Sequence, residues 1–562
     1  MSPRSAGPAT LVVRNANVHT LDPAMPRARA FAVRDGRIIT VGADADVDEL
    51  IGTDTEVIDA AGGLVMPGLV DVHSHVGFGG QQSAWELTLP PGADLPQILR
   101  TVADRAGEIG PDDWVVGGTV ISPVFQSVAT REALRALDDA ARGRPVLLRD
   151  DSLHNRWVNS RALEIMGVDA TTPDPVGGRY VRDEDGVHVG QLLEAPSTDA
   201  ELAVRRSVPD AHARDLVSVR TAVSIFNSVG VTATQDAATM GAWLDVFVEL
   251  DRIGALDAWI VGSLPAREFV ESGPVGVELF DSVGQRRSAH VRPDFVKAVL
   301  DGVPMTRTSK FLEPYKPDPW APPSTHQCPF TGNGLFTDEE LLDVLDAAVS
   351  RGLHAKLHAT ADGTVRQALD VIATMRERYG HGAVFHIAHP EFIDPDDVAR
   401  FRELDVVADL SPVLWFPNPM NDIIAMQVQS HYLDRIWPLR ELQDAGALLA
   451  AGSDWPVAMA APNPWLSIET MITRRNPDGA VPGVLCGDQA IDLASAVRAH
   501  TVNPARAMGL GQEIGRIKTG FSADFILPDQ DIFEIPIGRI HSTRVRQTWF
   551  AGRLVYDVDQ DL

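Results

Sequence analysis

Few cysteines and no long hydrophobic run are present in this sequence. Cys328 and Cys486 are the only two cysteines among 562 residues, which excludes a disulfide framework and a zinc cluster built on thiolates. A single disulfide stays compatible with this number, but a reducing compartment is the simpler interpretation. No stretch approaches the ~18 uninterrupted apolar residues of a membrane span, and the N-terminus lacks an apolar signal core. We therefore expect a soluble cytoplasmic protein.

Positive charge is scarce as well. The chain has 49 Lys and Arg against 77 Asp and Glu, a formal net charge of −28, which argues against nucleic acids and anionic membranes as partners. With 44% apolar and 22% charged residues the composition is that of a globular protein, which excludes a disordered or collagen-like chain. The partners that remain are a small-molecule substrate and a second copy of the chain, in a homo-oligomer such as a dimer.

The chain is too long for a single core, because cores stop growing beyond about 250–300 residues. Short segments rich in β-forming residues lie at both ends, over residues 11–18 and 30–41 and again over residues 524–527 and 544–556. Unpaired sheet edges at each end would be a liability, so we predict one sheet domain assembled from both termini. Two unrelated caps are the alternative.

Between the ends, short apolar runs alternate with amphipathic helical segments. The runs lie at residues 69–75, 145–149, 231–236, 295–300, 353–358, 383–389, 406–410 and 447–454. Eight repeats of strand and helix favour an α/β fold with a closed parallel barrel, and an open doubly wound sheet is the alternative. The segment from about residue 105 to about residue 220 is predicted to be an insertion that is helical and charged, with one obvious strand. The proline-rich segment 304–336 is predicted to be a long functional loop over the catalytic face of the barrel.

Ligand-type residues stand where several of these runs end. His73 and His75 are two residues apart, so both imidazoles lie on one side of a strand, as two ligands of one metal ion require. His358 and His389 close two later runs, and Asp454 closes another. Each histidine alone would more often be structural, but a carboxylate rarely ends an apolar strand without a partner. The five residues together favour a metal centre.

Lys297 lies inside a predicted strand, flanked by apolar residues. One interpretation is an ion pair with Asp294 or Asp301. Strand alternation is unfavourable for this pairing, because Asp294 points to the opposite face and Asp301 lies about 13 Å further along the strand. The other interpretation is a lysine converted by carbon dioxide into a carboxylate ligand.

In their order along the chain these residues resemble the amidohydrolase superfamily, and more narrowly its family 3 branch, which includes N-substituted formamide deformylases. Further matches are Met66–His75, His154–Leu163, Thr501–Ala505 and Gly515–Asp524. The resemblance implies a (β/α)₈ TIM barrel over residues 67–509 with the insertion, and a β-sandwich over residues 1–66 and 510–562. It also implies one or two divalent ions, usually zinc. The implied ligands are His73 and His75 from strand one, Lys297 from strand four and carboxylated where two ions bind, His358 and His389 from strands five and six, and Asp454 from strand eight.

Two positions depart from the pattern of the branch. Ala388 stands where the branch usually has glutamate, and Ala361 replaces a glycine after the strand-five histidine. Neither departure touches an expected ligand, but both concern the surroundings of the ligands and therefore the choice of substrate. Deaminases of the superfamily resemble one another in a glutamate three residues after the strand-five histidine, so Ala361 also counts against ring deamination.

The activity that we predict is hydrolysis of an amide C–N bond by metal-activated water, with Asp454 as the general base. His154, implied by the resemblance to face the substrate pocket, or His389 would assist at the oxyanion. The alternatives are lactone, ester or carbamate hydrolysis, non-oxidative decarboxylation on the same site, and a metal-free binding protein. Five aromatic residues near the expected catalytic face favour an N-substituted amide with an aromatic or apolar substituent: Tyr315, Trp320, Trp415, Phe416 and Trp455.

Overall fold

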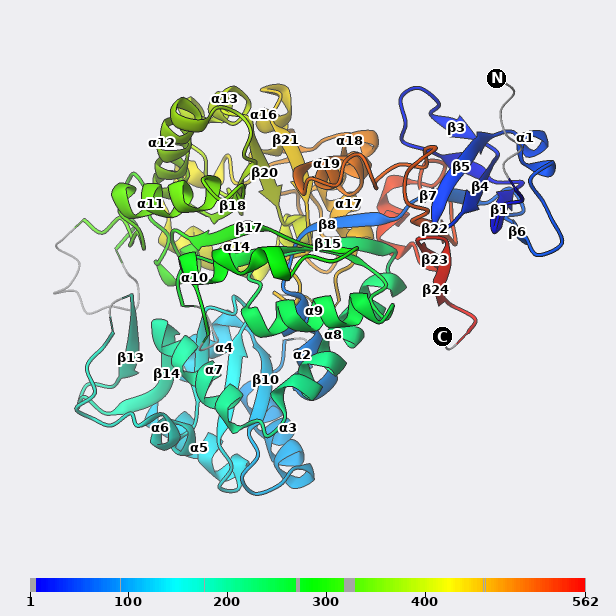
Figure 1. Cartoon of the computed structure of the whole chain (residues 1–562). Helices are drawn as coiled ribbons and strands as arrows, with labels where there is room; N and C mark the ends of the chain where they lie inside the picture. Colours follow the sequence, from blue (N-terminus) through cyan, green and yellow to red (C-terminus); the bar gives the residue numbers. More distant parts are fainter. Residues whose placement is uncertain are drawn as a thin grey trace.

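The computed structural model describes residues 7–90, 92–175, 177–268, 273–317, 329–457, 459 and 461–560. Figure 1 shows a central barrel, a second unit formed by the cyan part of the chain below it, and a β unit in which the blue and red ends of the chain meet. Among the helices of these described ranges, none combines the length and apolar composition needed to cross a membrane. Cys486 is a free thiol, and Cys328 lies outside the described residues.

Eight parallel strands form the barrel, which confirms the predicted (β/α)₈ class. In sheet order they are β21 (Leu448–Ala451), β20 (Val406–Leu410), β19 (Phe385–Ala388), β18 (His354–His358), β17 (Val291–Val299), β16 (Trp259–Pro265), β15 (Val231–Asp236) and β8 (Leu69–Ser74). The two end strands of this order meet at their carboxyl ends, where the N–H of Asp454, just after β21, donates to the carbonyl oxygen of His73 in β8 at 2.7 Å. The ends of β8 and β21 therefore share one site.

One of the eight predicted strands was assigned wrongly. Residues 145–149 form β11 (Val146–Asp150), which belongs to a different sheet, and the barrel contains β16 in its place. All seven residues of β16 are buried, but the strand is followed by only the short helix α10 (Gly276–Asp281). The strand–helix alternation is therefore weak there. With β16 included, Lys297 lies on β17, the fourth strand of the barrel.

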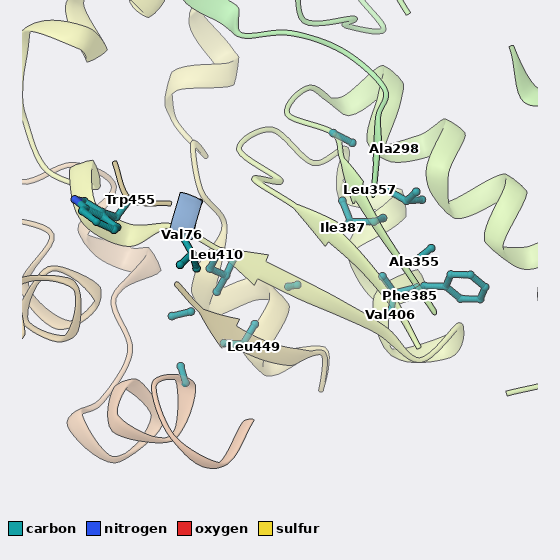
Figure 2. Packing of buried hydrophobic residues seen from close by; sticks show 14 of the residues in the cluster. Val76, Ala298, Ala355, Leu357, Phe385, Ile387, Val406, Leu410, Leu449 and Trp455 are labelled. Carbon is teal, nitrogen blue, oxygen red and sulfur yellow. The ribbon is translucent and has the colours of Figure 1, made fainter. Parts of the chain in front are cut away.

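Alternation along β18 separates an apolar outer face from an inner face that carries polar side chains. On β18, Ala355 and Leu357 point outward into the main apolar cluster, whereas Lys356 and His358 point to the other side. Figure 2 shows Ala355, Leu357, Phe385 and Ile387 among the packed apolar side chains of this cluster. The helices that surround the barrel are α8 (Ala211–Ser228), α9 (Gly241–Arg252), α11 (Asp338–Val349), α12 (Asp362–Tyr379), α13 (Pro395–Glu403), α16 (Leu439–Asp444), α17 (Pro464–Thr473), α18 (Leu493–Ala499) and α19 (Val502–Ala507).

The insertion is a sheet with helices, so the prediction of a helical segment with one strand was wrong. Its strands are, in sheet order, β13 (Gly178–Arg182), β14 (His188–Glu194), β12 (Asn155–Val158), β11, β10 (Val115–Val120) and β9 (Leu87–Thr88). Several of these strands are short or carry charged residues, which hid them from an apolar pattern. The associated helices are α3 (Leu95–Glu108), α5 (Arg131–Ala141), α6 (Ser160–Met166) and α7 (Ala195–Ser207).

Strands from both termini share one sheet. β7 (Leu64–Pro67) pairs in parallel with β2 (Asn17–His19) and antiparallel with β22 (Phe525–Pro528) near the other end of the chain. The sheet continues through β23 (Val545–Phe550) to β24 (Arg553–Asp557) on one side and ends at β3 (Arg27–Ala28) on the other. A second sheet, in the order β5-β4-β1-β6, contains β5 (Arg37–Gly42), β4 (Ala30–Arg34), β1 (Leu11–Arg14) and β6 (Glu56–Asp59). One residue, Gly68, separates β7 from barrel strand β8.

Candidate metal centre

Three predicted ligands converge at the carboxyl ends of β8 and β21. The Asp454 Oδ1 atom lies 3.6 Å from His73 Nε2 and 3.4 Å from His75 Nε2. One ligand atom of each of these three residues lies within 4.8 Å of those of the other two. Two imidazoles and a carboxylate are donors that zinc and similar divalent ions accept, so the residues fit the implied metal. Burial would raise the pKa of Asp454, but the neighbouring His389 and His75 hold it well below its usual value.

The other two predicted histidines lie beside this trio. The His389 ring centroid is 4.4 Å from that of His73 and 5.1 Å from that of His358. His389 Nδ1 is 3.3 Å from the Ser411 hydroxyl, and His389 Nε2 lies 4.0 Å from the second oxygen of Asp454. His358 Nε2 donates to the Gly302 carbonyl oxygen at 3.2 Å. His358 therefore keeps Nδ1, and His389 keeps Nε2, as the nitrogen available to an ion.

A buried carboxylate that the sequence reasoning missed orients His73. His73 Nδ1 lies 3.2 Å from both carboxyl oxygens of Asp409, which also forms a buried ion pair with Lys356. Burial raises and Lys356 lowers the pKa of Asp409, which ends well below its usual value. A carboxylate on the second ring nitrogen of a metal ligand fixes the ring and leaves Nε2 free for the metal. Asp409 could have been noticed as a lone acid within the apolar run 406–410.

Lys297 is buried against the same histidine. Its Nζ atom lies 3.4 Å from His73 Nε2. Burial, together with the charge of Lys356, lowers the pKa of Lys297 to about 7. Within the part of the chain that the structure describes, neither suggested carboxylate pairs with Lys297. Asp294 pairs with Arg287, and Asp301 instead accepts hydrogen bonds that include the Thr364 hydroxyl at 2.7 Å. The ion-pair interpretation of Lys297 is therefore wrong.

His154 approaches the centre from the insertion. It precedes β12, and its ring centroid lies 5.8 Å from that of His358. Its Nδ1 atom is 2.9 Å from Glu194 Oε2. Burial lowers and Glu194 raises the pKa of His154, with a net rise. Glu194 was missed because it is far from His154 in the sequence, and only the pairing of β12 with β14 brings the two together.

A cavity of about 920 Å³ opens over these residues and is lined by both the barrel and the insertion. Of the five predicted aromatic residues, Trp415 lines it, and it stacks on Trp437 with ring centroids 5.5 Å apart. Trp437, which also lines the cavity, was not predicted. Trp320 lies outside the described residues. The other three are buried away from the described lining: Tyr315, Phe416 and Trp455.

Comparisons with known proteins agree with this geometry. A model of the amidohydrolase family, Amidohydro_3, matches residues 56–556. The chain is 26% identical over 559 residues to an N-substituted formamide deformylase of Arthrobacter pascens, which covers 97% of this chain and 98% of that protein. It is 27% identical over 569 residues to Protein LONG AFTER FAR-RED 3 of Arabidopsis thaliana, covering 99% and 93% of the two chains.

Among solved structures, an uncharacterized metal-dependent hydrolase from Pyrococcus horikoshii OT3 has the same fold. The TM-score is 0.74 at 21% sequence identity, and the match covers 94% of this chain and 99% of that chain. Since the family model spans most of the sequence, the protein belongs to the amidohydrolase family and is a hydrolase of carbon–nitrogen bonds.

Proposed function

We propose that the protein hydrolyses an N-substituted amide whose nitrogen carries an aromatic or apolar group, with zinc as the metal. The observation that carries this proposal is the convergence of His73, His75 and Asp454 on a cavity with a tryptophan wall. The similarity over nearly full length to an N-substituted formamide deformylase supports the same class of substrate.

A divalent ion held by these residues supplies two effects when bound, because it lowers the pKa of a bound water and polarises a carbonyl. Asp454 supplies the proton transfer. Its Oδ1 faces His73 and His75, whereas Oδ2 lies on the side of His389. We assign Oδ2 as the atom that takes the proton of the attacking water and returns it to the departing nitrogen.

The stacked pair of Trp415 and Trp437 is suited to hold the substituent. Its two rings are nearly parallel, with an interplanar angle of 12°. The fully buried Arg474 guanidinium lies 5.4 Å from the Trp415 centroid and 5.9 Å from that of Trp437. Arg474 also donates to the carbonyl oxygens of Leu485 and Ile436, which fixes the guanidinium beside the two rings. A fixed aromatic surface of this kind favours a flat apolar group.

The proposed function is tested by metal analysis together with a substrate panel on the purified protein. The panel holds an N-benzyl amide, the N-methyl amide of the same acid, a lactone and a carbamate. We expect bound zinc and the highest kcat/KM for the benzyl amide. The W415A variant should lose about 10-fold to 100-fold in kcat/KM for the benzyl amide, since burial of a large apolar group contributes about 1.5–3 kcal/mol. The methyl amide is the matched control and should change little. Faster turnover of the lactone or carbamate, or equal losses for both amides, would contradict the proposal.

A second part of the proposal is that Lys297 is carboxylated and completes a site for two ions. The buried amine of Lys297 lies against His73, an expected metal ligand, and forms no ion pair with a carboxylate of the described residues. In the modification its nitrogen attacks carbon dioxide, an N–C bond forms, and a proton is released. We expect protein purified with ¹³C-bicarbonate to give a carbamate carbon signal in NMR that is missing from the K297R variant. A well-resolved crystal structure with an unmodified Lys297 and one fully occupied metal would contradict this part alone.

A further inference from the structure

Strand pairing in the insertion brings a further acidic residue, Glu194, to the cavity that Asp454 lines. β12 and β14 are antiparallel with Asn155 opposite Leu193, so the next residues outward, His154 and Glu194, face each other. Their side chains make the contact of 2.9 Å and are 22% and 18% exposed. Both residues line the cavity that holds the metal centre.

The turn that carries His154 is held by its own polar groups. Asp150 accepts hydrogen bonds from the Asn155 backbone N–H at 3.1 Å and from the Ser152 hydroxyl at 2.7 Å. The His154 N–H donates in turn to the Ser152 hydroxyl at 3.2 Å. These bonds fix the backbone of His154, but they leave the rotation of its ring to Glu194.

Glu194 is itself held in an unusual backbone conformation, with φ 59° and ψ −114°. Non-glycine residues rarely adopt such angles, which persist where the surrounding structure fixes them. Glu194 precedes α7, and the same helix carries Glu201, which is buried and bonded to Arg149 and Arg156. A second partner of Arg149 is Glu86, at the end of α2 (Val76–Trp85), the helix that follows His75. This buried ionic cluster connects α7 to the barrel through the end of α2.

Gly302 makes room for the Glu194 carboxylate beside the metal centre. A β-carbon at position 302 would lie 2.7 Å from Glu194 Oε1. The carbonyl of the same glycine accepts the hydrogen bond from His358 Nε2. The Glu194 Oε1 atom is buried and has no hydrogen-bond partner among the described residues. The carboxylate is therefore placed for its contact with His154, and it makes no other hydrogen bond to the described part of the chain.

We propose that Glu194 is a positioning residue that holds the His154 ring with Nε2 toward the cavity, where Nε2 contacts the oxygen of the scissile amide. This inference rests on the proposed function. The carboxylate engages Nδ1, so Nε2 is the only ring nitrogen left for a ligand, and a ring held in advance needs no reorganisation during the reaction.

The test is a double-mutant cycle on hydrolysis of the benzyl amide by the metal-loaded enzyme. We expect H154A to lower kcat by about 10²-fold, as for the loss of one group at a developing oxyanion. E194A should lower kcat by at least about 10-fold with little change in KM, in the range found for residues that orient a functional group. In the H154A background, E194A should have no further effect, because Glu194 acts through His154. E194Q keeps an oxygen acceptor and should retain more activity than E194A, and it replaces E194A if that variant does not fold.

A second measurement is independent of turnover. In protein labelled with ¹⁵N-histidine, the Nδ1 proton of His154, assigned by its absence from H154A, should be protected from exchange and lost in E194A. Equal effects of E194A in the wild-type and H154A backgrounds, or an unchanged His154 signal in E194A, would overturn the inference. Loss of bound metal in E194A would also overturn it, since Glu194 would then support the metal site. If the wild type hydrolyses no amide, the proposed function fails, whereas the NMR measurement still decides whether Glu194 holds the ring.

Discussion

The H73A/H75A double variant is expected to lose both its bound metal and its activity. Among the described residues, the ligand atoms of the two imidazoles and of Asp454 lie within 4.8 Å of one another, and the variant keeps one of the donors of this trio. Burial lowers the pKa of His73 to about 3, and His73 is therefore neutral, as a metal ligand must be. A bound ion contributes several kcal/mol to catalysis, so kcat should fall by at least about 10³-fold.

Metal content per chain and kcat are measured on the same preparations. The matched control is H212A/H381A, which removes two exposed histidines that are outside the described lining of the cavity. This control should keep both metal and turnover. Full turnover in the H73A/H75A variant would show that these histidines are not needed as metal ligands, whatever the metal content of the variant.

The D454N variant is expected to keep its shape and lose at least about 10²-fold in kcat, the lower end for acid–base catalysis. The carboxamide retains one oxygen near His73 and His75 but cannot accept the proton of water. Because Asp454 faces both histidines, metal content must be measured alongside kcat. We expect a loss of kcat in enzyme that still holds its ion.

D257N is the control, since Asp257 pairs with Arg553 on the surface and lies outside the cavity lining. If D454N kept its kcat and bound substrate more weakly, proton transfer would belong to another residue of the cavity. His154 would then be the first to test.

The sequence allowed prediction of residues that interrupt or end an apolar strand. His73, His358, His389 and Asp454 stand out because a polar side chain at the end of a buried run needs a reason. Since parallel strands end at the same edge of a barrel, four separate runs then indicate one place. This inference requires knowledge of the fold class alone. The fold class could be predicted even though one strand was assigned wrongly.

Other residues could not be found because their partners are set by tertiary pairing. The role of Asp409 depends on its contacts with His73 and Lys356, which lie on other strands of the barrel. Glu194 lies 40 residues from His154 and meets it only through the register of β12 and β14. The strand β16 was not predicted because the helix that follows it is short. The sheet of the insertion was not predicted because charged side chains interrupt its strands.

The shared sheet of the two termini has a consequence for synthesis on the ribosome. β7 leaves the ribosome early, one residue ahead of β8 with His73, but its partner β22 is translated only after the whole barrel. Until then β7 presents an open edge, which is prone to pairing with other chains. The nascent chain must therefore carry this edge through nearly all of translation. A transcript broken before Phe525 would give a chain that has every proposed ligand and still lacks the strand that covers β7.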